Sequence, residues 1–555
     1  MIVDRIRQRA KDAAFAAQVL RRTGMAGAFH ASCLPGFVRA ARGTRLGPHL
    51  AVMFHAHNNP DKEAIVEPLA NGVTRRLTWG QLDAEINKLC HALAARNVRG
   101  GDRVALMLPN GTDYLIAQQA LARLGAVAVQ IGYRLKTNEV VYILQNAEPR
   151  ATLVHADYLA TMQEARAQTN LGGALLVVGG GPGVAAERWE DAIVGVPSDR
   201  PPKVIGAEDT GGGVIVYTSG TTGKPKGATR NWKQTGLDAV ADMMVQVGMR
   251  TDDRHLVVCP LYHSAAPAFV AVMMSLGGTV VLMNSFDAEG ALALIEREKI
   301  TCTLVVPTML VRICALPEET RRKYDVSSLR WVMSGAAPLA TETAKRFMDQ
   351  FGPKLWNFYG ATETGIVTLA GPADHVSRPG TVGRMVRGNE IRLFGDDGRE
   401  VPTGQVGELY ARNKMLIAGY HKNDDATRSS MKEGFFSVGD LARRDADGFF
   451  YMESRKHDMV ISGGVNIYPR EIEDHIHNHP AVLEAAVIGV PDPEWGESLK
   501  AFVVRRAGHS LTAEEVVAWC RDGLADYKRP RAVVFVDELP RNPTGKVLKR
   551  ELRAQ

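Results

Sequence analysis

Residues 217–227 have the sequence Tyr-Thr-Ser-Gly-Thr-Thr-Gly-Lys-Pro-Lys-Gly and directly follow the apolar segment Val214-Ile-Val216. The β-branched residues of that segment predict a buried strand, because such side chains suit an enclosed pleated surface. The loop that follows combines glycines, hydroxyls and lysines, so its backbone N–H groups and cations can surround phosphate oxygens. It is not a Walker A loop, since Lys224 is followed by Pro225 instead of Ser or Thr. The stretch therefore predicts a strand that opens into a triphosphate-binding loop.

Five further motifs follow this loop in a fixed order. They are Asn357-Phe-Tyr-Gly-Ala-Thr-Glu-Thr-Gly365, Gly439-Asp440, Ser454-Arg455-Lys-His-Asp458, Ser462-Gly-Gly-Val-Asn-Ile-Tyr-Pro-Arg-Glu-Ile-Glu473 and Asn542-Pro-Thr-Gly-Lys-Val-Leu-Lys549. With them the chain resembles the adenylate-forming superfamily, which includes acyl-CoA synthetases, luciferases and the adenylation domains of peptide synthetases. Among these it is most similar to fatty acyl-CoA ligases. The resemblance begins near Leu77-Thr-Trp-Gly-Gln-Leu82 and covers about 500 residues.

The resemblance implies a nucleotide site and a magnesium ligand. The implied ATP- and AMP-binding residues are Thr218, Ser219, Gly220, Thr221, Thr222, Gly223, Lys226, Gly335, Ala336, Ala337, Asn357, Phe358, Tyr359, Gly360, Thr362, Asp440, Arg455 and Lys546. Within this set, Tyr359 would pack against adenine, Thr362 would lie at the α-phosphate, and Asp440 would accept the ribose hydroxyls. Glu363 would hold Mg²⁺, a hard cation that favours carboxylate oxygen. Thr218, Glu363 and Lys546 are the implied catalytic residues.

The implied chemistry solves a leaving-group problem. A carboxylate does not react with a thiol, but its attack on the α-phosphate of ATP expels pyrophosphate and makes AMP the leaving group. Both reactants are anionic, so Lys546, Mg²⁺ on Glu363 and the loop donors would reduce their repulsion. The resemblance then implies that a hinge at His457 rotates Lys546 away before CoA reacts. Ser462, Gly463 and Gly464 would line the CoA tunnel after this rotation.

The identity of the acid is predicted from the pocket walls. The implied acyl pocket contains His263, Val306, Ala336, Gly360 and Ala361. These side chains are mostly small or aliphatic, and none of them is an acid that could receive an amino group. We therefore expect a medium- to long-chain fatty acid, with an aryl acid as the second choice. The alternative function is delivery of an acyl group to a carrier protein or another acceptor.

Composition and patterning predict the organisation of the chain. A length of 555 residues exceeds one core, and a formal charge of +6 without long basic runs does not indicate nucleic-acid binding. Alternating strands and helices, such as 102–108, 114–123 and 126–130, predict an α/β fold with parallel sheets. The expected architecture is a large N-terminal domain of two helix-flanked β-sheets plus a small β-barrel, followed by a small mobile α+β C-terminal domain. The predicted boundaries are 1–48 for an N-terminal extension, 49–456 for the large domain and 457–555 for the small one.

Two segments bear on localisation. Residues 1–22 predict a basic amphipathic helix, which we expect to pack on its own protein or a subunit neighbour. Contact with an anionic membrane, a mitochondrial presequence and a homodimer are left open. The uncharged segment 264–283 contains Pro267 and Gly277-Gly278, so we expect a loop, a helix and a strand instead of a membrane span. Six cysteines without a C-x-x-C pair are typical of a reduced, cytoplasmic protein.

Overall fold

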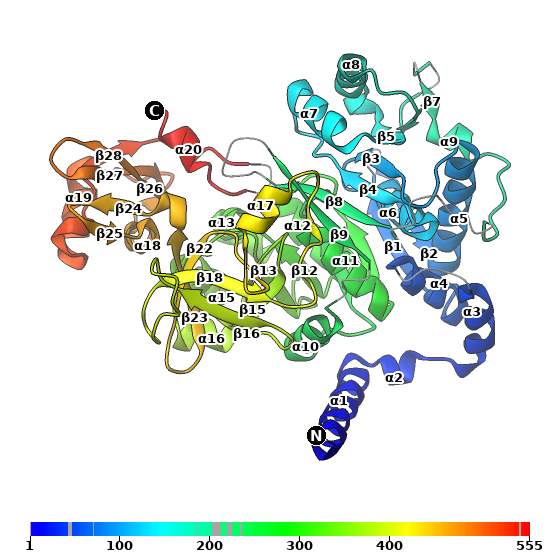
Figure 1. Cartoon of the computed structure of the whole chain (residues 1–555), viewed down its shortest axis with the longest axis horizontal. Helices are drawn as coiled ribbons and strands as arrows, with labels where there is room; N and C mark the ends of the chain where they lie inside the picture. Colours follow the sequence, from blue (N-terminus) through cyan, green and yellow to red (C-terminus); the bar gives the residue numbers. More distant parts are fainter. Residues whose placement is uncertain are drawn as a thin grey trace.

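The computed structural model describes residues 2–42, 47–69, 72–181, 183–184, 186–201, 212–218, 225–232, 236–542 and 545–555. In this part of the chain the strands form three sheets (Figure 1). Two of them make up the body of the molecule, and the third lies at one end with the C-terminus. This arrangement agrees with the predicted α/β fold, and the largest fully buried side chains include Trp79, Tyr114 and Trp331 in the body.

The first of these sheets carries the predicted phosphate loop. Its strand order is β19 (Gly419–Tyr420), β9 (Lys226–Asn231), β8 (Gly213–Thr218), β4 (Val127–Gln130), β3 (Arg103–Met107), β5 (Ala151–His155), β6 (Ala174–Val178) and β7 (Glu187–Arg188). The strands from β8 to β7 run parallel, whereas β8 and β9 form an antiparallel pair that brackets residues 219–224. The helices α6 (Thr112–Leu124), α7 (Thr137–Ala147) and α8 (Leu159–Thr169) provide crossovers between these strands. Parallel pairing requires such crossovers, so the predicted βαβ alternation is confirmed.

The second sheet is mixed, with parallel strands in its centre and antiparallel strands on both sides. Its order is β2 (Thr74–Thr78), β1 (Glu63–Pro68), β11 (Thr279–Leu282), β10 (Arg254–Val257), β12 (Cys302–Val305), β13 (Trp331–Ser334), β14 (Leu355–Ala361), β15 (Gly365–Ala370), β16 (Thr381–Met385), β23 (Phe449–Arg455), β22 (Asp440–Arg444), β18 (Gly407–Arg412), β21 (Phe435–Phe436) and β20 (Met431–Lys432), with β17 (Glu390–Phe394) paired to β18. The strands of the expected small barrel, from β16 onward, continue this sheet and pack around their own cluster of Val382, Ile391 and Leu409.

The third sheet lies in the C-terminal part. It contains β25 (Val465–Ile467), β24 (Val460–Ser462), β27 (Gly496–Arg505), β26 (Val482–Asp492) and β28 (Ala532–Phe535). Helices α18 (Pro469–His477) and α19 (Ala513–Gly523) accompany it, and Thr512 caps α19 in a capping box with Glu515. The short 3₁₀ segment Lys456–Asp458 joins this unit to β23.

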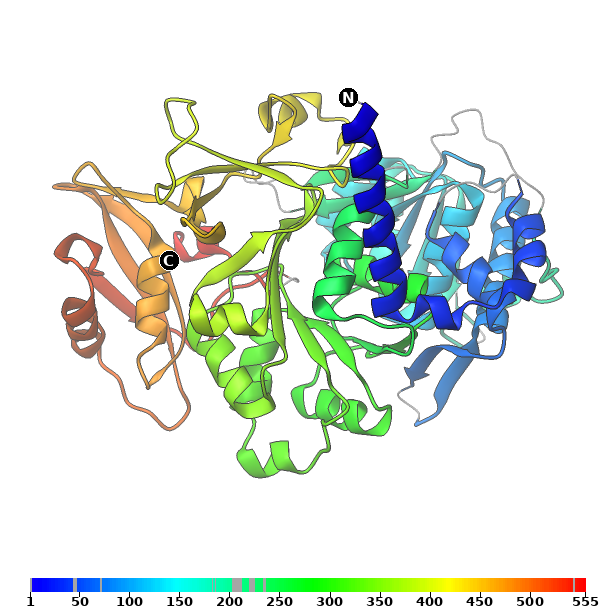
Figure 2. The same cartoon turned by 90° about the horizontal axis from the view of Figure 1, so that it is seen from below.

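Helices α11 (Ala265–Leu276) and α1 (Ile2–Thr23) resolve two of the predictions. Pro267 lies in the first turn of α11, where its missing N–H costs no helical hydrogen bond, so the helix begins before the proline and not after it. Helix α1 runs along α10 (Leu237–Val247), as the view in Figure 2 shows. Packing of the extension on its own chain is therefore the observed arrangement. In the described ranges, every helix is too short or too polar to cross a membrane.

Candidate active site

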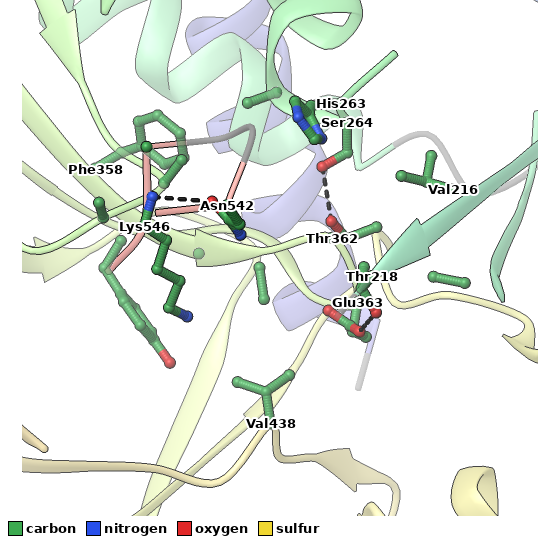
Figure 3. A pocket seen from close by; sticks show the side chains of 18 of the residues that line it. Val216, Thr218, His263, Ser264, Phe358, Thr362, Glu363, Val438, Asn542 and Lys546 are labelled. Carbon is green, nitrogen blue, oxygen red and sulfur yellow. Dashed lines mark hydrogen bonds between the residues drawn. The ribbon is translucent and has the colours of Figure 1, made fainter. Parts of the chain in front are cut away.

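One large cavity connects the two body sheets with the C-terminal unit. Its volume is about 1550 Å³, and its walls come from β8, β9, β14, α10, α11 and residues between 437 and 551. Figure 3 shows that Thr218, Glu363, Thr362, His263 and Lys546 surround the same space. The parallel strands end at this space, which is where open α/β sheets place their ligands.

The two ends of the predicted phosphate loop lie at the cavity. Thr218 closes β8 and Lys226 opens β9, and the two residues are register partners. The Thr218 hydroxyl lies 3.3 Å from Glu363 Oε1, and it also lies 3.4 Å from the main-chain oxygen of Lys226. Lys226 Nζ stands 5.1 Å from the ring centre of Tyr420. Ser219, Gly220, Thr221, Thr222 and Gly223 fall outside the described residues.

Glu363 is a buried carboxylate, and one of its two oxygens accepts two hydrogen bonds. Its Oε1 accepts hydrogen bonds from Thr218 and, at 3.1 Å, from the phenol of Tyr420. No hydrogen bond within the described residues engages Oε2, and no group of three metal-ligating side chains occurs in that part of the chain. A single carboxylate suits Mg²⁺, because this ion keeps several waters and takes other oxygens from substrate phosphates. The donor set therefore fits a magnesium ion that arrives with ATP.

The segment 335–337 is closely packed. The resemblance predicts that this segment contacts the nucleotide. A Cβ on Gly335 would lie 2.2 Å from Cε1 of Phe358, so only glycine fits at this position. Ala336 has a φ of 66°, a left-handed conformation that costs a residue with a Cβ roughly 1–2 kcal/mol. Ala336 and Ala337 line the cavity together with Asn357, Phe358, Tyr359 and Gly360. Strain of this kind is typical of functional loops.

Asp440 connects Tyr359 with Arg455. The Tyr359 phenol donates to Asp440 Oδ2 at 2.9 Å, and Arg455 Nε lies 3.2 Å from Asp440 Oδ1. Asp440 and Arg455 are register partners in β22 and β23, so the ladder itself sets this pair. Burial and the nearby Asp440 charge raise the pKa of Tyr359 well above its usual value.

Lys546 enters the cavity from the C-terminal unit. Its main-chain N–H donates to Asn542 Oδ1 at 2.9 Å, and Figure 3 shows both residues beside Phe358. A Cβ on Gly545 would lie 3.0 Å from Thr308 Oγ1, which places this loop directly on the large domain. Burial, followed by the Arg455 charge, lowers the pKa of Lys546 from 10.5 to about 8.

Sequence reasoning did not find several contacts that hold these parts together. Arg470 donates to the main-chain oxygen of Leu339 at 3.1 Å, and His477 Nε2 lies 3.4 Å from the Thr343 hydroxyl. Ser264 and Thr362 share a hydrogen bond of 2.8 Å between their hydroxyls. The partners in each pair are distant in sequence, so no local motif signals them.

The predicted acyl-pocket residues divide into two groups. His263, Ala336, Gly360 and Ala361 line the cavity. His263 Nε2 is buried without a partner among the described residues, and burial lowers the pKa of this imidazole to about 3. Val306 is buried just before α13 (Pro307–Ala315) and is not a lining residue. Instead, its Cγ2 lies 3.4 Å from the position of a Cβ on Gly545.

The predicted CoA residues lie elsewhere in this conformation. Ser462, Gly463 and Gly464 belong to the hairpin of β24 and β25, where both glycines are exposed with φ values of 57° and 79°. None of the three lines the cavity, as far as the described residues show. His457 does line the cavity, and its main-chain oxygen accepts a hydrogen bond from Arg553 at 3.5 Å.

Comparisons with known proteins identify the family of this chain. The family model described as AMP-binding enzyme matches residues 53–421, and the AMP-binding enzyme C-terminal domain matches 471–546. The chain is 37% identical to a feruloyl-CoA synthase of Amycolatopsis over 500 residues, covering 89% of this chain and 97% of the relative. It is 33% identical to the long-chain-fatty-acid–CoA ligase FadD13 of Mycobacterium tuberculosis, covering 90% and 96%.

The crystal structure of ATP-bound MatB from Rhodopseudomonas palustris superposes with a TM-score of 0.81 at 30% identity, covering 92% of this chain and 98% of that one. The predicted resemblance is therefore confirmed, with ATP and CoA as the substrates typical of such relatives. The chain belongs to the AMP-binding enzyme family and is an acyl-CoA ligase of the AMP-forming type.

Proposed function

We propose that this enzyme joins an apolar carboxylic acid to CoA in two half-reactions at the described cavity. In the first, the acid carboxylate attacks the α-phosphate of ATP and pyrophosphate leaves. In the second, the CoA thiol attacks the acyl carbon and AMP leaves. One observation carries the proposal: Lys546 of the C-terminal unit and Glu363, Asp440 and Arg455 of the body line one continuous cavity.

The first half-reaction needs positive charge between two anions. We assign this task to Lys546, with Thr218 and Lys226 at the two ends of the phosphate loop as further donors. Glu363 would hold Mg²⁺, which neutralises phosphate oxygens when bound. Asp440 and Arg455 would bind the ribose hydroxyls, and their mutual contact of 3.2 Å holds both side chains in place before ATP arrives.

The second half-reaction needs a different arrangement. Lys546 and the loop around Gly545 occupy the cavity next to Thr308, so CoA requires this loop to leave. We propose that the 3₁₀ segment containing His457 is the hinge. Rotation there would bring the exposed hairpin of Ser462, Gly463 and Gly464 to the cavity, where close backbone approach suits a narrow pantetheine chain.

The acid would occupy the part of the cavity beyond His263. Its walls there include Val240, Met243, Phe269 and Val272, which are apolar side chains on α10 and α11. Such walls accept a medium- to long-chain fatty acid, our first candidate, and also an aryl acid. The relatives bear names of both kinds, a feruloyl-CoA synthase and a long-chain-fatty-acid–CoA ligase.

A panel of carboxylic acids tests this function. Purified enzyme with ATP and Mg²⁺ is expected to release pyrophosphate with at least one fatty or aryl acid, and to form a thioester only when CoA is added. Mass spectrometry of the products distinguishes acyl-AMP from acyl-CoA. Absence of both products across alkyl and aryl acids would contradict the proposal.

A further inference from the structure

One face of strand β9 forms a floor of the cavity. Alternate residues of a strand point to the same side, and Lys226, Ala228, Arg230 and the following Trp232 all line the cavity. The register pairs Lys226 with Thr218, Ala228 with Val216 and Arg230 with Val214. The floor thus passes from the phosphate loop, over an apolar row, to the half-buried Arg230.

Arg230 is a cation in the part of the cavity that we assign to the acid. The Cα atoms of Lys226 and Arg230 are about 13 Å apart, since Arg230 lies four steps along an extended strand from Lys226. The register partner of Arg230, Val214, is an apolar lining residue, as are Val240 and Met243 on α10. In the described residues before position 400, the charged lining residues are Glu139, Lys226, Arg230 and Glu363.

The guanidinium of Arg230 uses little of its hydrogen-bonding capacity. It donates to the main-chain oxygen of Thr362 at 2.8 Å, while a guanidinium offers five N–H groups. Within the described parts of the chain, Arg230 forms no ion pair with a carboxylate. Burial lowers the pKa of Arg230, and the charge of Glu363 raises it in partial compensation. Glu363 itself is engaged by Thr218 and Tyr420.

Arg230 is half-buried, and a half-buried cation without an ion-pair partner is stabilised when a ligand supplies the counter-charge. We assign the cations Lys226, Arg455 and Lys546 to ATP binding. The apolar side chains of Val216 and Ala228 lie between Arg230 and the end of the phosphate loop. The acid is thus the substrate that reaches Arg230. We propose that Arg230 binds a second carboxylate of the acid substrate, a few carbons away from the carboxylate that is adenylated.

The inference rests on the proposed function, which it narrows from apolar acids to acids with an apolar body and a second anionic end. The hydrogen bond from Arg230 to the main-chain oxygen of Thr362 fixes the position of the guanidinium relative to Thr362. Thr362 is the residue that we place at the α-phosphate, so the second carboxylate would lie only a few carbons from the reacting one. A guanidinium binds a carboxylate through two parallel N–H donors, so the enzyme would select a diacid whose second carboxylate has this orientation.

Paired acids test this inference. Monocarboxylic acids and dicarboxylic acids of equal carbon number are compared by pyrophosphate release and thioester formation. The wild-type enzyme is expected to favour one chain length of diacid over its monoacid partner by about 10- to 100-fold in kcat/KM, the range of a hydrogen bond to a charged group. Preference for monoacids at every length, with thioester still formed, would overturn the inference and leave the proposed function intact. Failure of every acid would instead reject the function.

Two variants locate the effect. Arg230→Met should lose about 10- to 100-fold on the favoured diacid and change less than about threefold on the monoacid and in the KM for ATP. Arg230→Lys should recover part of the diacid activity, because lysine keeps the positive charge but lacks the two parallel N–H donors of arginine. Equal losses on both acids, or a raised KM for ATP, would show that Arg230 only supports Thr362 and would overturn the inference. Arg250→Met is the matched control, because Arg250 is exposed and pairs with Asp252 two residues away.

Discussion

The phenol of Tyr420 donates a hydrogen bond of 3.1 Å to Oε1 of Glu363, on the oxygen that also accepts from Thr218. Both donors hold one carboxylate oxygen, which leaves the other oxygen for a ligand. Main-chain contact between Ile417 N–H and Glu363 O, 2.9 Å long, anchors the two segments. Tyr420 therefore positions the proposed magnesium ligand.

Replacement of Tyr420 by Phe should weaken magnesium-dependent adenylation. Loss of one hydrogen bond to a charged group is expected to raise the Mg²⁺ concentration needed for half-maximal pyrophosphate release by about tenfold. The KM for the acid should stay within about twofold of the wild-type value. Tyr410→Phe is a suitable control, since Tyr410 lies on β18 outside the cavity lining. An unchanged Mg²⁺ titration would contradict the positioning role.

Lys546 should give the adenylation step an alkaline limit. Its pKa of about 8 in the free enzyme means that the charge is present below this pH and is lost above it. Because kcat/KM reports groups of the free enzyme, kcat/KM for ATP should fall as the pH rises through about 8. Lys546→Arg, which stays charged, should remove this alkaline limb. The same alkaline limb in the arginine variant would rule out Lys546 as its source.

The half-reactions should separate in Lys546→Ala. Pyrophosphate release is expected to fall by roughly 100- to 1000-fold, the effect of removing one electrostatic donor to a transition state. Thioester formation from supplied acyl-AMP should fall less than about tenfold. Rapid-quench measurement of each step checks this, and equal losses in both steps would show that the lysine serves both.

Arg470 should influence only the conformation used for adenylation. Its hydrogen bond to Leu339 O joins α18 to the body, and the thiol step is proposed to use another arrangement. Arg470→Gln should therefore lower the adenylation rate by about tenfold and leave thioester formation from acyl-AMP within about twofold. Lys528→Gln is the control, because Lys528 pairs with Glu471 inside the C-terminal unit. A matching loss in the thiol step would contradict this division.

Gly335 should not tolerate a side chain. A Cβ there would meet the Phe358 ring at 2.2 Å, so Gly335→Ala is expected to destabilise the protein by about 1–3 kcal/mol and raise the KM for ATP. Gly172→Ala is the matched control, since a Cβ at Gly172 meets nothing within 4 Å. Thermal unfolding of both variants gives the comparison, and equal melting temperatures would show that Phe358 moves aside freely.

Local patterns were sufficient for the elements and for the nucleotide motifs. The apolar run before Thr218 became β8, and the alternation between 102 and 130 became β3, α6 and β4. The segment 264–283 forms the predicted helix and strand, α11 and β11, but the helix begins at Ala265 because a proline is tolerated in the first helical turn. The assignment of Val306 to the acyl pocket remains a prediction, and in this conformation that residue packs beneath Gly545.

The order of residues alone determined the family, the parallel sheets and the motif residues, because backbone propensity and short spacings are local properties. Tertiary structure decided which residues meet across separations of 57 to 132 positions: Tyr420 at Glu363, Arg470 at Leu339, and Arg230 at Thr362. Such contacts depend on sheet register and on the docking of the C-terminal unit. These contacts contribute to the free energy of folding mainly where burial removes water from charged and polar groups.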